Sequence, residues 1–253
     1  MALLHVHFFS RTRGVASSVD VILPEGEQGI GVTASGGDAL PRVLYLLHGY
    51  SDDHTIWQRR TSIERYAAGH NLAVIMPAVN HSFYCNEQGG EKYWDYVAHE
   101  LPEVMHRFFR LSDKPEDTFV AGLSMGGYGA MKLALNFPER FGAAASFSGA
   151  VDLLTMADRK GADWKRIFGR KKVAGTDCDL FHLLTKNADA PRKPRLYVSC
   201  GTMDFLYGQH MQFVPEAIEA GWDVTHYEEP GAAHEWSFWD QEIAKFIPWM
   251  LGE

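Results

Sequence analysis

The sequence has few cysteines and no long apolar run. Its 253 residues include three cysteines, Cys85, Cys178 and Cys200, and no CxxC pair, which argues against a disulfide framework or a structural zinc site. No segment approaches the roughly 20 apolar residues that a membrane-spanning helix needs, so no membrane partner is expected. The first ten residues lack the basic start and apolar stretch of a signal peptide, which favours a cytoplasmic protein.

Positive charge is also scarce. Lys and Arg number 24 against 32 Asp and Glu, and the net charge is −8, so no nucleic-acid partner is expected. An apolar fraction of 46% and a charged fraction of 22% exclude a largely disordered chain. Because no internal repeat or low-complexity tract divides the sequence, we expect a single domain over residues 1–253.

Strand and helix patterns alternate along the chain. Alternating residues at 4–10 and 15–23 predict an antiparallel hairpin, and the glycine-rich residues 24–41 predict a loop. Further strands, several of them continuous apolar runs, are expected at 43–47, 72–77, 118–122, 141–147, 195–200 and 224–227. Helices are expected at 62–69, 92–110, 125–136, 211–220 and 237–251. This order predicts an α/β fold with a mostly parallel sheet and helices on both faces.

Residues 151–190 interrupt the alternation. They contain several Gly and Asp and a basic cluster made of Arg159, Lys160, Lys165, Arg166, Arg170, Lys171 and Lys172. We interpret the segment as an insertion between two core strands that forms a small cap over the carboxyl edge of the sheet. The basic cluster is either a solvated surface or a lid that recognises an anion, and the sequence leaves both interpretations open.

A nucleophile motif follows the strand expected at 118–122. The residues GLSMG at 122–126 have the GxSxG form and lie between a strand and a helix. Small residues allow a serine to stand on a tight, strained turn, and the helix N-terminus favours a developing negative charge. The pattern predicts Ser124 as the nucleophile; the alternative is an ordinary glycine-rich turn. Ser146 and Ser148 lack the flanking glycine pattern and are typical of a strand end.

A serine nucleophile needs a base, and in this class of fold an acid and then a histidine follow it in the chain. His234 lies in a loop between a strand and the last helix, where a general base is expected. Asp204 lies in the loop after the strand at 195–200 and is the expected acid, which would orient His234. The rivals are less well placed in the chain, and His226, inside a strand, is more typical of a structural residue; they are His182, His210, His226, Asp177, Asp179 and Asp223.

Two backbone N–H groups, those of Met125 and Tyr50, are the expected oxyanion hole. His48 ends a buried strand, and we interpret it as a hydrogen-bonding structural residue. Bulky side chains near these motifs predict a substrate pocket for short acyl groups, formed by Phe83, Tyr84, Phe205, Leu206 and Trp236. No histidine–carboxylate cluster shows ligand spacing in the sequence, so we expect no metal and no organic cofactor.

These motifs together resemble the tributyrin-esterase (EstA-type) branch of the esterase D family. The matching residues are LLHG at 46–49, Trp57, AGLSMGGY at 121–128, SFSG at 146–149, CGTMDF at 200–205 and HEW at 234–236. That family also contains S-formylglutathione hydrolases and is related to feruloyl and acetylxylan esterases and to mycolyltransferases. The resemblance implies an α/β-hydrolase fold with a triad of Ser124, Asp204 and His234 and oxyanion donors at Tyr50 and Met125.

The resemblance predicts a serine carboxylesterase that hydrolyses short-chain, small-molecule esters through an acyl-enzyme on Ser124. S-formylglutathione, hydroxycinnamate esters and acetylated sugars are alternative substrates for the same chemistry. Two other classes stay open: an acyltransferase that uses an alcohol in place of water, and a non-catalytic binding protein on the same fold. A homo-oligomer, dimer or tetramer, is compatible with the resemblance, but no residue identifies its interface.

Overall fold

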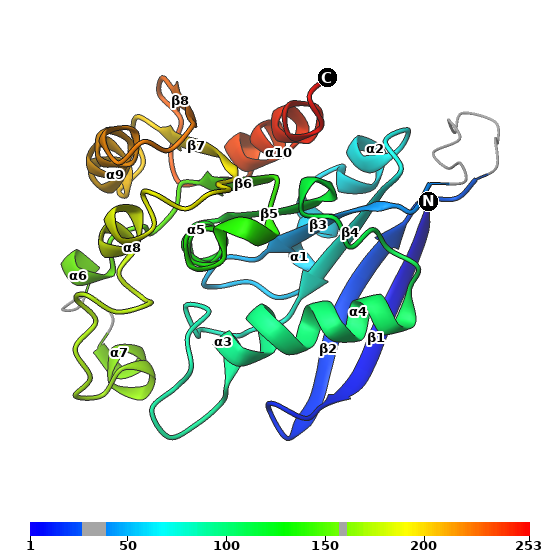
Figure 1. Cartoon of the computed structure of the whole chain (residues 1–253), viewed down its shortest axis with the longest axis horizontal. Coiled ribbons are helices and arrows are strands. Elements are labelled where there is room, and N and C mark those ends of the chain that lie inside the picture. Colours follow the sequence, from blue (N-terminus) through cyan, green and yellow to red (C-terminus); the bar gives the residue numbers. More distant parts are fainter. Residues whose placement is uncertain (27–38, 157–160) are drawn as a thin grey trace.

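A single eight-stranded sheet forms the centre of the molecule (Figure 1). The computed structural model describes residues 1–26, 39–156 and 161–253. The strands are β1 (Ala2–Ser10), β2 (Val15–Leu23), β3 (Arg42–Leu47), β4 (Leu72–Pro77), β5 (Thr118–Leu123), β6 (Ala143–Phe147), β7 (Arg195–Gly201) and β8 (Val224–Glu229). Their order is β1-β2-β4-β3-β5-β6-β7-β8. β2 pairs antiparallel with β1 and β4, and β3 to β8 run parallel, as predicted.

Helices cover both faces of this sheet. They are α1 (Ile56–Arg60), α2 (Ile63–Ala67), α3 (Tyr93–Asp95), α4 (Leu101–Phe108), α5 (Met125–Asn136), α6 (Leu153–Met156), α7 (Gly161–Ile167), α8 (Leu180–Lys186), α9 (Tyr207–Glu219) and α10 (Trp236–Leu251). The helices α4, α5, α8 and α9 pack on one face, and α1, α2 and α10 pack on the other. A π-helical stretch, Tyr96–Glu100, joins α3 to α4, so the helix expected at 92–110 changes its hydrogen-bond register on the way.

Successive residues of the central strands enter two different cores. In β3, Val43 and Tyr45 contribute to the core beneath α5, whereas Leu44 and Leu46 contribute to the core beneath α10. Side chains of a strand alternate between faces, and both faces are covered by helices. This double burial explains why β3 is a continuous apolar run and not an alternating one.

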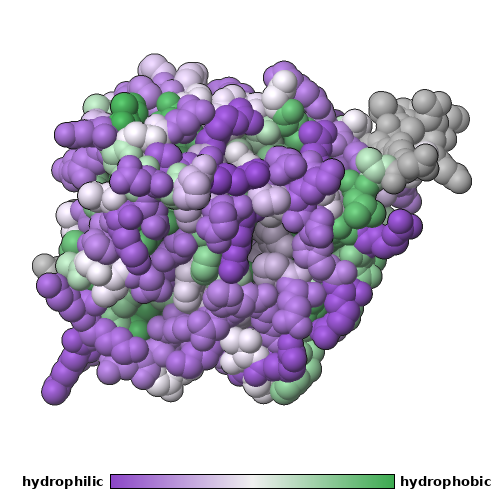
Figure 2. Space-filling view, viewed as in Figure 1, coloured by the Kyte–Doolittle hydropathy of each residue, from purple (hydrophilic) through white to green (hydrophobic). Residues whose placement is uncertain are grey.

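The segment 151–190 forms α6, α7 and α8 between β6 and β7. Arg159 and Lys160 of the basic cluster lie outside the described residues, as does most of the loop expected at 24–41. The helix expected at 211–220 begins earlier, at Tyr207. Within the described ranges, no helix combines the length and apolar character needed to cross a membrane. The face seen in Figure 2 is mainly hydrophilic, with hydrophobic residues in small separate groups.

Candidate active site

Ser124 stands at the turn between β5 and α5. Its backbone has φ 53° and ψ −116°, in a region that residues other than glycine rarely adopt. The Ser124 N–H donates to the Phe147 carbonyl at 2.9 Å, and the Ser124 carbonyl accepts from the Ala150 N–H at 3.1 Å. The end of β6 and the segment that follows it therefore hold this strained turn in place.

Two glycines of the motif are required by close backbone contacts. A Cβ atom at Gly122 would lie 2.4 Å from the Gly126 carbonyl oxygen, and one at Gly126 would lie 2.3 Å from the Leu47 carbonyl oxygen. Real Cβ atoms do not approach backbone atoms so closely. The GxSxG spacing thus lets α5 start directly against the ends of β5 and β3, with Ser124 at the helix N-terminus.

Asp204 and His234 meet at the carboxyl ends of β7 and β8. The His234 Nδ1 lies 2.8 Å from Asp204 Oδ2, and the other Asp204 oxygen, Oδ1, accepts from the Leu206 N–H at 2.8 Å. Asp204 is buried, and the His234 side chain is 19% exposed. Phe205 and Trp239 pack on the imidazole with ring centroids 4.5 and 4.8 Å away. The imidazole is thus held by one carboxylate and two aromatic rings.

The expected nucleophile and base face one cavity of about 520 Å³. Its lining residues are Gly49, Tyr50, Ser51, Asp52, Leu123, Ser124, Phe205, His234, Glu235, Trp236 and Trp239. Of the five side chains expected in a substrate pocket, Phe205 and Trp236 line this cavity. The other three, Phe83, Tyr84 and Leu206, are buried and are not among its lining residues.

The loop after β3 is anchored by His48. One ring nitrogen, Nδ1, lies 2.7 Å from the Gly49 carbonyl oxygen, and the other, Nε2, accepts from the Val79 N–H at 3.1 Å. Burial lowers the pKa of His48 to about 4, although the Gly49 contact opposes the shift, so the ring is neutral near pH 7. This agrees with a structural role for His48, because both nitrogens are engaged away from the cavity.

The backbone N–H groups of Tyr50 and Met125 belong to two segments that border the cavity. Met125 is the first residue of α5, where N–H groups lack partners within the helix. The Met125 sulfur accepts from the Phe83 N–H at 3.3 Å. Phe83 therefore contacts the side chain of Met125, one of the two expected oxyanion residues, although it does not line the cavity.

Tyr50 also connects the cavity to the segment 151–190. Its hydroxyl donates to a carboxylate oxygen of Asp163 in α7, and its ring stacks on His81 at 4.2 Å. Asp163 also pairs with Arg166 at 2.9 Å. No sequence motif marked Asp163 or His81, because they lie 113 and 31 residues from Tyr50 in the sequence and only folding brings the three side chains together. Asp52 in the cavity wall was also missed, and partial burial raises its pKa.

The rival residues have other surroundings. Ser146 and Ser148 are fully buried, and the Ser148 hydroxyl accepts from Trp239 Nε1 at 3.1 Å. Asp179 caps the N-terminus of α8, where its side chain accepts from the His182 N–H. None of these residues lines the cavity that Ser124 and His234 share.

One group of side chains among the described residues has its possible ligand atoms close enough together to hold a metal ion. The ligand atoms of His210, His226 and Glu228 lie within 4.8 Å of one another. This corrects the expectation that no histidine–carboxylate cluster has ligand spacing: His226 and Glu228 lie two residues apart in β8, and α9 supplies His210. The group adjoins another cavity, which none of the expected triad residues lines.

Comparisons with known proteins agree with this architecture. An acetyl esterase of Caldicellulosiruptor saccharolyticus is 30% identical over 262 residues, which cover 99% of this chain and 98% of that protein. The structure of FphF, a fluorophosphonate-binding serine hydrolase of Staphylococcus aureus, is 37% identical, with a TM-score of 0.89 and coverage of 100% and 99%. An S-formylglutathione hydrolase structure from Staphylococcus aureus is also 37% identical, with a TM-score of 0.86 and coverage of 99% and 98%.

A family model described as "Putative esterase" matches residues 17–250, and the match spans the strained serine turn, Asp204 and His234. The fold of the chain is that of the α/β-hydrolases, as these structures show. The chain therefore belongs to this esterase family and is a carboxylic ester hydrolase.

Proposed function

We propose that the protein is a serine carboxylesterase for short acyl esters, with Ser124 as nucleophile, His234 as base and Asp204 as the acid that orients His234. One observation carries the proposal. A histidine paired at 2.8 Å with a buried aspartate shares a cavity with a serine on a strained strand–helix turn. We also propose that it belongs to the tributyrin-esterase branch of the esterase D family.

The geometry supports the following sequence of steps. Nδ1 of His234 is bound to Asp204, so Nε2 is the nitrogen that takes the Ser124 proton as Oγ attacks the ester carbonyl. The C–O bond to the alcohol then breaks, and the alcohol leaves with that proton, which gives an acyl-enzyme. Water attacks the acyl group with His234 again as base, and the acid leaves as Ser124 regains its proton.

The oxyanion would be stabilised by the N–H groups of Met125 and Tyr50. Each such donor is worth roughly 3–4 kcal/mol in the transition state. The start of α5 adds its helix dipole at Met125. The hydrogen bonds of His48 to Gly49 and Val79 limit movement of the loop that carries Tyr50. Preorganised donors of this kind require neither a metal nor an organic cofactor.

The test is a panel of p-nitrophenyl esters of increasing acyl length, methyl ferulate, acetylated xylan and S-formylglutathione. We expect the highest kcat/KM on the acetyl and butyryl esters, and none of this activity in Ser124→Ala. A protein that hydrolyses no member faster than Ser124→Ala contradicts the proposal. Product analysis with an added alcohol separates hydrolysis from acyl transfer.

S-formylglutathione hydrolysis is the second candidate. A Paracoccus denitrificans S-formylglutathione hydrolase is 30% identical over 154 residues, which cover 52% of this chain and 51% of that protein. A kcat/KM on S-formylglutathione well above that on p-nitrophenyl acetate would favour this candidate. A cytoplasmic location, a capping role for 151–190 and a homo-oligomer stay predictions.

A further inference from the structure

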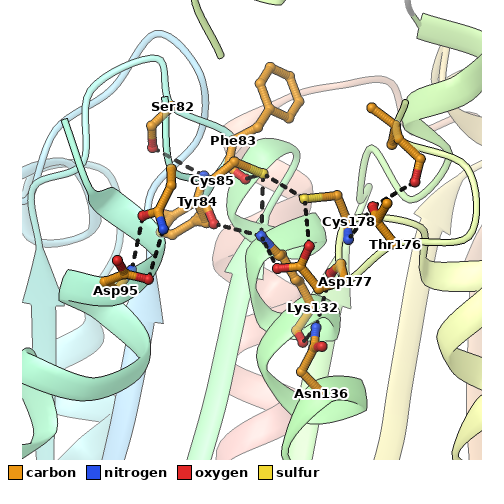
Figure 3. Close-up of polar contacts among 12 residues, drawn as sticks. Ser82, Phe83, Tyr84, Cys85, Asp95, Lys132, Asn136, Thr176, Asp177 and Cys178 are labelled. Carbon is orange, nitrogen blue, oxygen red and sulfur yellow. Dashed lines mark hydrogen bonds and ion pairs between the residues drawn. The ribbon is translucent and has the colours of Figure 1, made fainter. Parts of the chain in front are cut away.

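Two cysteines that lie 93 residues apart in the sequence meet near the start of α5. Cys85 follows β4 in the chain, and Cys178 precedes α8 in the segment 151–190 (Figure 3). Their sulfur atoms are 3.5 Å apart, which is contact distance for two thiols, whereas a disulfide bond measures about 2.05 Å. Both cysteines are free, and their sulfur atoms are adjacent.

A buried cation lies against this pair. Lys132 of α5 is fully buried, and its ammonium donates to Cys85 Sγ at 3.4 Å and to the Tyr84 carbonyl at 3.2 Å (Figure 3). The carboxylate of Asp177 lies 3.8 Å away, and the ring of Trp94 is 4.0 Å from Nζ. A buried ammonium needs negative or polar partners, and a neighbouring thiolate is one of them.

The surroundings of the two thiols differ. The contact with Cys85 lowers the pKa of Cys178; burial opposes the shift, and the Lys132 ammonium adds to it. Burial raises the pKa of Cys85 well above its usual value. Cys178 is half-buried and lines a cavity of about 210 Å³ together with Lys132, Lys171 and Lys172, whereas Cys85 is not among its lining residues. A small reagent therefore reaches Cys178 first.

We propose that Cys178 and Cys85 form a reversible disulfide when hydrogen peroxide oxidises the protein. The Cys178 thiolate attacks the peroxide, the O–O bond breaks, and a sulfenic acid and, with one added proton, water result. The Cys85 sulfur then attacks the Cys178 sulfur, the S–O bond breaks, and its oxygen leaves as a second water with the thiol proton. Two thiols are oxidised to one disulfide while one peroxide is reduced to two waters.

The disulfide would tie the segment 151–190 to the loop behind the oxyanion region. Phe83 and Tyr84, directly before Cys85, have φ values of 50° and 51°. The Phe83 N–H contacts the Met125 sulfur, and the Tyr84 hydroxyl donates to the His48 carbonyl at 3.0 Å. Because the sulfurs must move roughly 1.5 Å closer to bond, this loop or the segment that carries Cys178 must shift. We expect lower kcat in the oxidised protein, a consequence that rests on the proposed function.

The experiment treats the purified full chain with hydrogen peroxide, blocks the remaining thiols with an alkylating reagent and maps peptides by mass without reduction. We expect a Cys85–Cys178 linked peptide, an intact mass lower by about 2 Da from the loss of two hydrogens, and reversal by dithiothreitol. Cys200 is the internal control. It is buried in β7, and burial raises its pKa to about 12. We therefore expect Cys200 to stay reduced and to react with the alkylating reagent only after the protein is unfolded.

Two variants test the order of events. In Cys85→Ala, peroxide should leave a sulfenic acid on Cys178 that a dione reagent traps. In Cys178→Ala, Cys85 should remain reduced. Absence of the linked peptide in the wild-type protein, or oxidation of Cys85 in Cys178→Ala at the wild-type rate, overturns the proposal. Both readouts are peptide masses and not activities, so their outcome does not depend on whether the protein is an esterase.

Discussion

Ser124 keeps a backbone conformation that glycine would adopt at lower cost. Ser124→Ala retains the Cβ and the strain and removes only the hydroxyl. We therefore expect kcat/KM to drop by about 10⁴-fold or more, with Tm changed by less than about 3 °C. Ser124→Gly should be equally inactive but more stable than the Ala variant by about 1 kcal/mol. Ester hydrolysis measures kcat/KM, and thermal unfolding measures the stability of each variant. Residual activity above a few per cent in Ser124→Ala contradicts the assignment of Ser124 as the nucleophile.

Asp204 uses its two oxygens differently, and this predicts the effect of Asp204→Asn. An asparagine has one acceptor oxygen, but the Leu206 N–H and the His234 Nδ1–H both need an acceptor. If the oxygen stays on Leu206, the amide NH₂ faces His234 and favours the wrong tautomer. We expect kcat to fall by about 10⁴-fold. A variant with kcat within tenfold of wild type would show that Asp204 does not orient the base.

The lowered pKa of His48 predicts that the free energy of unfolding decreases at acid pH. Its folded-state pKa of about 4 lies below the value of about 6.5 in an unfolded chain. Between these pH values the unfolded chain binds a proton that the folded chain does not, so stability falls as the pH falls, by at most about 3 kcal/mol. Urea unfolding from pH 7 to 4 measures this loss, and His48→Gln, which can still donate and accept, should lose less. Equal pH slopes for both proteins would contradict the prediction.

At the scale of elements, the site is a meeting of loops at one edge of the sheet. β3 leads to Tyr50, β5 to Ser124, β7 to Asp204 and β8 to His234. Parallel strands bring these loops together because their carboxyl ends share an edge. α7 reaches the same edge through the Tyr50–Asp163 contact, so the segment 151–190 touches the loop that carries Tyr50.

The walls of the cavity predict a preference for short acyl chains. Each buried methylene adds roughly 0.8 kcal/mol where space exists, but overfilling a packed site costs about 1–3 kcal/mol. With Phe205, Trp236 and Trp239 as walls, we expect the best kcat/KM at about two to four carbons and weak activity beyond about eight. If kcat/KM, measured with one leaving group below the micelle limit, rises steadily out to the decanoyl ester, the site is an open groove and the prediction is wrong.

A matched pair of variants tests whether Phe205 is one of those walls. Phe205 and Phe9 are both 66% exposed, but Phe9 lies in the edge strand β1, far from β7 in the sheet order. In Phe205→Ala the ratio of kcat/KM for octanoyl and acetyl esters should rise at least about threefold, since a threefold change is about 0.7 kcal/mol, less than one buried methylene. Phe9→Ala should keep the wild-type ratio, and equal ratios in both variants would remove Phe205 from the pocket.

For the whole molecule, we predict that chelators leave the esterase activity unchanged. The proposed steps use only Ser124, His234, Asp204 and two backbone N–H groups. The group formed by His210, His226 and Glu228 adjoins a different cavity. If EDTA lowers kcat and one particular metal ion restores it, the proposed mechanism is wrong. If EDTA lowers only the thermal stability, the protein binds a structural ion and the proposed chemistry is unaffected.

Much of this molecule could be predicted from local sequence patterns. The continuous apolar runs of β3 and β5 predict buried strands, because the side chains on both faces of these strands enter a hydrophobic core. The glycines at 122 and 126 marked the serine turn, because a Cβ there would overlap backbone. His234 and Asp204 followed from their places after the last two parallel strands.

Long-range contacts could not be predicted in the same way. Whether Phe205 or Phe83 faces the cavity depends on how loops from different strands pack, and neither residue carries a local signal of its direction. The contacts of Tyr50 with Asp163, of Cys85 with Cys178, and of His210 with Glu228 each join residues that are 18 to 113 positions apart. The sequence alone thus determined the fold class and the triad candidates, because both follow from local backbone geometry and strand order. The tertiary structure alone decided the cavity walls, the thiol pair and the histidine–glutamate group, because only the packing of distant segments brings these side chains together.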